Sequence, residues 1–174
     1  RAVLAAEDQR FFEHPGYDLR ELQAALQANQ AEVGVRRGGS TLSQQLAKRV
    51  ATGDERSAIR KLRELLYAVE MEQTLGKMRI LQLYLDNAPW GAGLCGADAA
   101  ARDYFRRSAR ALEPAQAVWL AAMLHNPDAE ARRWAQSGSI ALPRAQWVAR
   151  GVQGLAPRAR TALAQGLLAL AAPG

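Results

Sequence analysis

Turn residues divide this chain into helical segments, and no segment alternates apolar and polar residues as a half-buried strand does. Alanine (36 residues) and leucine (23) are abundant among the 174 residues, whereas valine and isoleucine together number 11. Because alanine and leucine favour helices and β-branched residues favour strands, this balance predicts an all-α fold. The length suits one domain with a sizeable core, so we expect a single domain over residues 1–174.

Capping residues and glycines predict where helices begin and end. Asp18 is typical of an N-cap, and Ser40 is expected to cap a helix that runs to about Val50. A long helix is expected to begin near Ser57 and to end at Gly76. Further helices are expected over residues 2–9, 78–85, 97–105 and 114–124.

The last third of the chain is basic. Residues 1–100 carry 13 basic and 13 acidic side chains, whereas residues 101–174 carry 10 and 4. Pro127 is expected to stop the preceding helix, and residues 128–174 form a divergent basic tail with less regular helices. Such a tail suits an anionic surface, and a merely solvated arginine-rich tail remains the alternative.

Several classes of protein are excluded by cysteine, histidine and hydropathy. The single cysteine, Cys95, excludes an internal disulfide and a cysteine-rich zinc site. His14 and His125 are expected to be structural, and no metal site is predicted. No run approaches the roughly 18 apolar residues of a membrane span. Since the chain begins at Arg1 inside a predicted helix, we expect an N-terminal anchor outside it.

Two adjacent carboxylates mark the end of the first predicted helix. Glu7 and Asp8 are followed by Phe11, Phe12 and His14. An apolar wall beside a carboxyl group raises its pKa towards the range of a general base. An exposed acidic helix end is the alternative, and composition alone favours it.

The segment 38–48 reads GGSTLSQQLAK. On a helix, Ser40, Gln44 and Lys48 are four residues apart and share one face. A glycine-rich start at a helix N-terminus suits an anion or sugar hydroxyl groups. The spacing of a Walker phosphate loop is absent. A solvated polar face is the alternative, and the sequence does not separate the two.

A cation cluster surrounds one carboxylate in the next segment. Arg56, Arg60, Lys61 and Arg63 all lie within eight residues of Glu64. Such a cluster suits a diphosphate, because charge-assisted contacts to phosphate are strong. A surface ion pair between Arg60 and Glu64, four residues apart, is the alternative that spacing alone favours.

Taken in order, these segments and two that follow resemble glycosyltransferase family 51. This is the peptidoglycan glycosyltransferase domain of class A penicillin-binding proteins and monofunctional transglycosylases. The matching patterns are ED-x-x-F-x-x-H-x-G from Glu7, GGST-[IL]-x-QQ-x-x-K from Gly38, R-K-x-x-E from Arg60, I-L-x-x-Y-L from Ile80 and G-x-x-x-AA-x-x-YF from Gly96. With the helix that follows from Glu113 and ends in Asn126-Pro127, the resemblance covers about residues 3–127.

The chain departs from the family pattern in three places. Arg49 and Asp86 stand where the family usually has asparagine, and Arg106-Arg107 stands where it favours Gly-Lys. These departures keep open a degenerate module that binds lipid II or a cell-wall partner without turnover.

The resemblance implies a lysozyme-like α-helical fold with a mobile small lobe near residues 17–37 that touches the bilayer. It also implies polymerisation of lipid II into glycan strands, with inversion and release of undecaprenyl diphosphate. No cofactor would be required, although a divalent cation such as Mg²⁺ or Mn²⁺ could assist the diphosphate. The partners would be lipid II, the growing strand, the membrane surface and other cell-wall synthesis proteins, at the outer face of the bacterial cytoplasmic membrane.

The resemblance also implies residue roles. Glu7 would be the base for the acceptor 4-hydroxyl, and Glu64 would position the cations or assist departure of the phosphate. Lys48, Arg56 and Arg60 would hold the diphosphate. The remaining substrate-binding residues would be Asp8, Phe11, His14, Ser40, Gln44, Gln45, Lys61 and Tyr84.

Two further functions remain as alternatives. A lysozyme-like glycan-cleaving enzyme also uses paired carboxylates, but its neutral bond needs no cation cluster. An arginine-rich nucleic-acid binder would leave the order of the motifs as coincidence, so we expect no nucleic-acid partner. Ser-x-x-Lys and Lys-Thr-Gly are absent, so no penicillin-binding transpeptidase domain lies within this chain.

Overall fold

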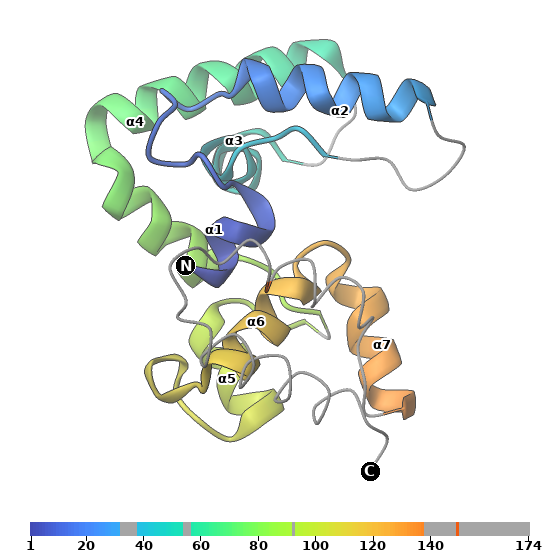
Figure 1. Ribbon diagram of the computed structural model, residues 1–174. Helices are drawn as coiled ribbons and strands as arrows, with labels where there is room; N and C mark the ends of the chain where they lie inside the picture. The colour runs from blue at the N-terminus through green and yellow to red at the C-terminus, as the bar shows by residue number, and fades with distance from the viewer. Residues whose placement is uncertain (32–37, 54–56, 92, 138–148, 150–174) are drawn as a thin grey trace. The chain divides into compact units, whose positions relative to one another are not determined.

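The computed structural model describes residues 1–31, 38–53, 57–91, 93–137 and 149. Helices dominate this part of the chain, and its one β-type contact is an isolated bridge between Pro89 and Cys95, which confirms the predicted all-α fold. The α-helices are α1 (Ala2–Glu7), α2 (Leu19–Ala31), α3 (Leu42–Ala47), α4 (Ala58–Asn87), α5 (Ala97–Phe105), α6 (Pro114–Met123) and α7 (Pro127–Ser137) (Figure 1). None of these described helices combines the length and the apolar composition that crossing a bilayer requires.

The chain divides into two compact units. Unit 1 combines residues 1–9 with residues 85–174, and unit 2 comprises residues 10–84. The predicted site residues are therefore split, because Glu7 and Asp8 belong to unit 1 and the cation cluster belongs to unit 2. The single domain over residues 1–174 stays a prediction.

Helix α6 forms the core of unit 1. It contacts α1, α5 and α7, and its residues Val118 to Met123 are all buried. The ring of Trp119 packs edge-on against Tyr104 and Phe105, with centroids 5.3 and 5.1 Å away. The Tyr104 hydroxyl donates to the Trp90 carbonyl at 3.0 Å, and burial raises the pKa of Tyr104. Tyr104 and Phe105 thus pack against the core of the unit.

Asp98 ties the first turn of α5 to the 3₁₀ turn at Ala109–Ala111. Its carboxylate accepts the Ala109 N–H at 2.8 Å and the Arg102 Nε–H at 2.7 Å. These two donors hold the pKa of Asp98 below its ordinary value. A carboxyl whose pKa is lowered by folding stabilises the fold while ionised, so this link weakens as the pH falls through the lowered pKa.

Helix α7 was not predicted from the sequence. The preceding helix α6 ends at Met123, before Pro127 as predicted, but Pro127 also begins α7, which continues to Ser137. The first turn of a helix leaves its N–H groups unbonded within the helix, so a proline there removes no hydrogen bond. The predicted helices near Pro143 and Pro157 lie outside the described residues.

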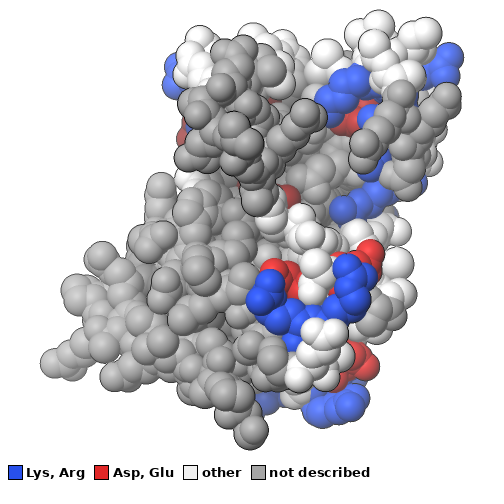
Figure 2. Space-filling model, turned by 90° about the vertical axis from the view of Figure 1, so that its right-hand side faces the viewer, with Lys and Arg blue, Asp and Glu red and all other residues white. Residues whose placement is uncertain are grey.

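The described start of the basic tail has mixed charge. Arg132 and Arg133 are exposed on α7, and Arg133 pairs with Glu130 at 3.6 Å. On the face that Figure 2 presents, Lys and Arg side chains lie beside Asp and Glu side chains rather than in one unbroken cationic patch. The arginines of the tail beyond α7 lie outside the described residues.

A close backbone approach brings the loop after α4 against the start of α7. Gly91 has a φ of +79°, and a Cβ placed there would lie 2.4 Å from the Pro127 carbonyl oxygen and 2.6 Å from the Ala131 Cβ. Gly93 in the same loop has a φ of +76°, but a Cβ there would meet no atom within 4 Å.

We predict that Gly91→Ala lowers the free energy of unfolding by clearly more than Gly93→Ala. Both changes place a side chain in the left-handed region, which costs about 1–2 kcal/mol. Only Gly91→Ala must also displace α7. Urea denaturation followed by circular dichroism measures both variants, and equal losses would contradict the close approach.

In unit 2, Asp18 caps α2 as the sequence predicts. Its Oδ1 accepts the backbone N–H groups of Arg20 at 2.9 Å and Glu21 at 3.2 Å. Leu19 and Leu22 are exposed on this helix. The mobility of the lobe near residues 17–37 and its contact with a bilayer stay predictions, and residues 32–37 lie outside the described part of the chain.

Helix α4 bends sharply at Gly76, as Figure 1 shows. Gly76 has a φ of 71° and a ψ of 163°, which no helical residue adopts. The predicted end of a helix at this glycine is confirmed, and the second predicted helix follows it directly as the other half of α4.

Candidate active site

The residue that caps α3 is Thr41, so the prediction of Ser40 as the cap is wrong. Thr41 Oγ1 accepts the Gln44 N–H at 3.2 Å, and Gln44 Oε1 accepts the Thr41 N–H at 3.0 Å. This reciprocal pair is a capping box, and Thr41 has the extended backbone that it requires (φ −68°, ψ 165°). Ser40 precedes the helix and Gln44 is buried, so Ser40, Gln44 and Lys48 do not form one solvated helical face.

Thr41 also holds the glycine of the first motif. Its hydroxyl donates to the Gly16 carbonyl at 2.6 Å, and the Gly16 N–H donates to Nδ1 of the buried His14 at 3.2 Å. Gly16 has a φ of +102°, and a Cβ there would lie 3.0 Å from the Ala68 carbonyl oxygen on α4. The absence of a side chain therefore lets this loop lie directly against α4, with His14 as the hydrogen-bonding support that the sequence predicts.

We predict that Thr41→Ala destabilises the protein by about 1–2 kcal/mol, the usual cost of losing an N-cap. Ser40→Ala is the matched control, because it also removes one hydroxyl group, and its effect should stay within about 0.5 kcal/mol. Thermal unfolding of both variants measures the difference. A larger loss for Ser40→Ala would restore Ser40 as the cap.

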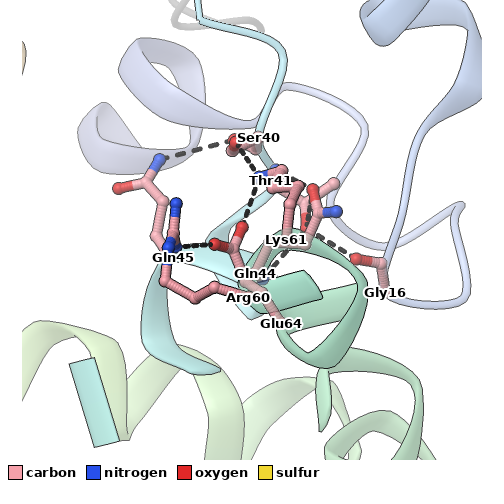
Figure 3. Close-up of polar contacts among 8 residues, drawn as sticks. All are labelled: Gly16, Ser40, Thr41, Gln44, Gln45, Arg60, Lys61 and Glu64. Carbon is pink, nitrogen blue, oxygen red and sulfur yellow. Dashed lines mark hydrogen bonds and ion pairs between the residues drawn. The ribbon is translucent and has the colours of Figure 1, made fainter. Parts of the chain in front are cut away.

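Glu64 is a buried carboxylate held by two cations. Its side chain is 3% exposed, and Arg60 Nη1 lies 2.8 Å from its Oε2 atom. Lys61 Nζ contacts the other carboxylate oxygen and donates to Ser40 Oγ at 2.9 Å (Figure 3). The Lys61 side chain is 47% exposed, so the cluster has a cationic group at the surface.

The charges of this cluster explain its geometry. A buried carboxylate is costly unless cations compensate it, and both oxygens of Glu64 accept from a cation. The alternative of an ordinary surface pair between Arg60 and Glu64 is wrong, because Glu64 is buried. Two cations to one carboxylate leave a net positive charge, as an anion site requires. Arg56, the remaining predicted phosphate ligand, lies outside the described residues.

Tyr84 and Gln45 join the far end of α4 to the same segment. The buried Tyr84 donates its hydroxyl to Gln45 Oε1 at 3.0 Å, and Gln45 Nε2 donates to the Ser40 carbonyl at 3.4 Å. The Arg49 guanidinium carbon lies 5.3 Å from the centroid of the Tyr84 ring, in a cation–π contact. Arg49, which departs from the family pattern, therefore packs against Tyr84, a predicted site residue.

Arg49 takes this position from a π-helical turn that follows α3. The turn spans Lys48–Thr52. At its start, the Lys48 N–H donates to carbonyl oxygens of the preceding turn. Such widened turns are frequent at functional sites because they redirect side chains. Lys48 itself is half-buried at the start of the turn.

The two carboxylates of the first motif lie in unit 1. Helix α1 ends at Glu7, and the Asp8 N–H donates to the Leu4 carbonyl at 2.9 Å. Asp8 is buried, Glu7 is half-buried, and Glu7 Oε1 is shielded from solvent. The alternative of an exposed acidic helix end is therefore wrong, and α1 contacts the core helix α6.

Sequence reasoning missed a second, partly buried ion pair in unit 2. Lys77 Nζ lies 2.7 Å from Glu72 Oε1 and 4.5 Å from the centroid of the buried Phe11 ring. The spacing of five residues is not the helical ion-pair spacing, and it closes only because α4 bends at Gly76 between the two residues. The one available signal was that a helix-ending glycine separates them.

Within the described residues, no group of three or more His, Cys, Asp or Glu side chains is placed to hold a metal ion.

The transglycosylase family model matches residues 1–153 of this chain. The biosynthetic peptidoglycan transglycosylase of Nitrosomonas eutropha is 44% identical over 127 residues, which cover 73% of this chain and 52% of that protein. The proteins of the same name from Thiobacillus denitrificans and Aromatoleum aromaticum are 46% and 47% identical over 127 residues, again 73% of this chain and 55% of each relative. The chain thus spans about half the length of the curated relatives it matches.

Proposed function

This chain belongs to the transglycosylase family, as its motifs predicted, and on that premise we propose that it is a peptidoglycan glycosyltransferase. Its substrates are lipid II and the growing glycan strand. It joins their disaccharide units with inversion and releases undecaprenyl diphosphate, at the outer face of the bacterial cytoplasmic membrane. The membrane surface and other cell-wall synthesis proteins are its further partners. It requires no cofactor, although a divalent cation such as Mg²⁺ or Mn²⁺ could assist the departing diphosphate.

The observation that carries this proposal is the Glu64 cluster. Transfer of a sugar from a diphosphate develops negative charge on the leaving group, and preorganised cations stabilise that charge. Arg60 and Lys61 are held in place by Glu64 before any ligand arrives. Because both of its oxygens accept from cations, Glu64 acts as the anion that positions them. Lys48 and Arg56 complete the diphosphate site.

Glu7 is the general base of the proposed reaction. The acceptor 4-hydroxyl oxygen forms the new bond to the anomeric carbon of the donor while the bond from that carbon to the diphosphate oxygen breaks. The hydroxyl proton passes to Glu7, and the electron pair of the broken bond leaves with the diphosphate. Asp8 lies next to this base at the end of α1.

The other predicted site residues divide by exposure. Phe11, His14, Gln44 and Tyr84 are buried, so they support the site from within. Ser40 and Gln45 are half-buried, and they offer their polar groups to sugar or phosphate oxygens.

We predict that the purified protein converts labelled lipid II in detergent into a ladder of glycan chains on a gel. Glu7→Gln should lower the rate by about 10²–10⁴-fold, the usual contribution of a general base. Glu13→Gln is the matched control, because it makes the same change at a solvent-exposed carboxylate, and it should leave the rate unchanged.

The assay also separates the alternatives. Lipid II binding without a ladder would indicate a non-catalytic module. Arg49 and Asp86, which depart from the family pattern, are the reason to consider this alternative. Release of soluble fragments from purified sacculi would indicate a glycan-cleaving enzyme. If the protein makes no ladder and does not bind lipid II, the proposed function is overturned.

A further inference from the structure

Helix α4 contacts one short segment at two distant points. Lys61 Nζ donates to Ser40 Oγ at 2.9 Å, and Tyr84 donates its hydroxyl to Gln45 Oε1 at 3.0 Å. Ser40 and Gln45 are themselves joined by a 3.4 Å hydrogen bond. In a straight helix, residues 61 and 84 would be separated by about 34 Å, at 1.5 Å per residue. Both contacts can therefore exist together only because α4 bends.

The bend at Gly76 is not held by packing at the glycine itself. A Cβ placed at Gly76 would meet no atom within 4 Å, so no neighbouring element fills the space where a side chain would stand. The ion pair of Glu72 and Lys77 lies across the bend, with one partner in each half of α4 and a distance of 2.7 Å between the charged atoms.

The same pair is anchored to two other parts of unit 2. Glu72 Oε1 accepts the hydroxyl of the fully buried Ser43 on α3 at 2.5 Å. Lys77 Nζ donates to the His14 carbonyl at 2.5 Å and lies over the Phe11 ring. The Glu72 and Lys77 side chains are 8% and 22% exposed. The pair thus fixes both halves of α4 against α3 and against the segment of the first motif.

We propose that Glu72 and Lys77 are positioning residues of the transglycosylase reaction. They hold the bend of α4, and the bend places the Tyr84–Gln45 contact and the Glu64 cluster on the same segment at the same time. The pair makes its described contacts with protein groups, so it acts through these residues rather than as an acid, a base or a ligand of substrate. This inference rests on the proposed glycosyltransferase activity.

The first test measures the bend of α4 directly and does not depend on enzymatic activity. Arg63 and Gln82 are exposed and lie in the two halves of α4. Cysteines at these two positions, in a Cys95→Ser background, carry spin labels whose separation is measured by pulsed electron resonance. We expect one narrow distance distribution in the parent protein and a broadened or shifted one in Lys77→Met. An unchanged distribution would overturn the inference.

The kinetic test uses the lipid II assay at a temperature where every variant is folded. Lys77→Met and Glu72→Gln should lower kcat by about 10–100-fold with a smaller change in KM. Misplacing the groups of the site slows the chemical step more than it weakens binding of the substrate. Lys77→Arg keeps the charge and should recover most of the rate. Arg79→Met, an exposed cation two residues further along α4, should leave kcat unchanged.

A purely structural role is excluded by a control of matched stability. Met123→Ala truncates a buried residue in the core of unit 1, far in sequence from the pair, and lowers the melting temperature. If it lowers kcat as much as Lys77→Met does, the positioning role is overturned. If the parent protein makes no glycan chains, the proposed function fails, whereas the distance measurement still decides whether the pair holds the bend.

Discussion

The bend of α4 is the constraint on which the rest of unit 2 depends. A helix of 30 residues is about 45 Å long when straight, so it cannot contact a six-residue segment near both ends. The bend at Gly76 returns the second half of α4 towards α3, and Tyr84 reaches Gln45 as a result. The cation cluster around Glu64 depends on the same arrangement, because Lys61 in the first half contacts Ser40 just before α3.

Helix α4 presents a row of residues two turns long to α3 and the first-motif loop. Glu64, Ala68 and Glu72 follow one another at a spacing of four, and each meets a different neighbour. Glu64 is paired with cations, Ala68 is fully buried where Gly16 approaches its carbonyl, and Glu72 accepts from Ser43 and Lys77. Buried ion pairs are poor stabilisers in comparison with apolar packing. Two ion pairs with shielded carboxylates along one helix therefore fit a site that must hold charged groups in place better than they fit a core selected for stability alone.

The departures from the family pattern have unequal structural weight. Arg49 packs on the ring of Tyr84, so this departure makes a contact within the candidate site. Asp86 and the pair Arg106-Arg107 are exposed. Arg106 adopts a φ of +56° at the end of α5, a conformation more often taken by glycine, which is the residue that the family favours there.

The sequence by itself determined the elements and the chemistry that each one carries. Asp18, Gly76 and Pro114 mark helix ends or starts through local backbone preferences, and local preferences can be read without knowing the tertiary contacts. The order of the motifs identified the family. The sequence did not distinguish Ser40 from Thr41 as a cap, because both are good capping residues and the choice depends on which one takes the extended backbone just before the first turn. It also missed α7, since a proline that follows the end of one helix equally suits the first turn of the next.

Only the tertiary structure decided which charges are buried and what they contact. Spacing alone favoured a solvated pair of Arg60 and Glu64, but burial made that carboxylate the centre of a compensated cluster. The contacts of Lys77 could not be read from the sequence beyond the glycine that separates it from Glu72, because Glu72 and His14 reach it through a bend and through a loop that folds back from residues far away in the chain. Desolvation gives such contacts their importance, and desolvation is a property of the packed fold rather than of any local segment.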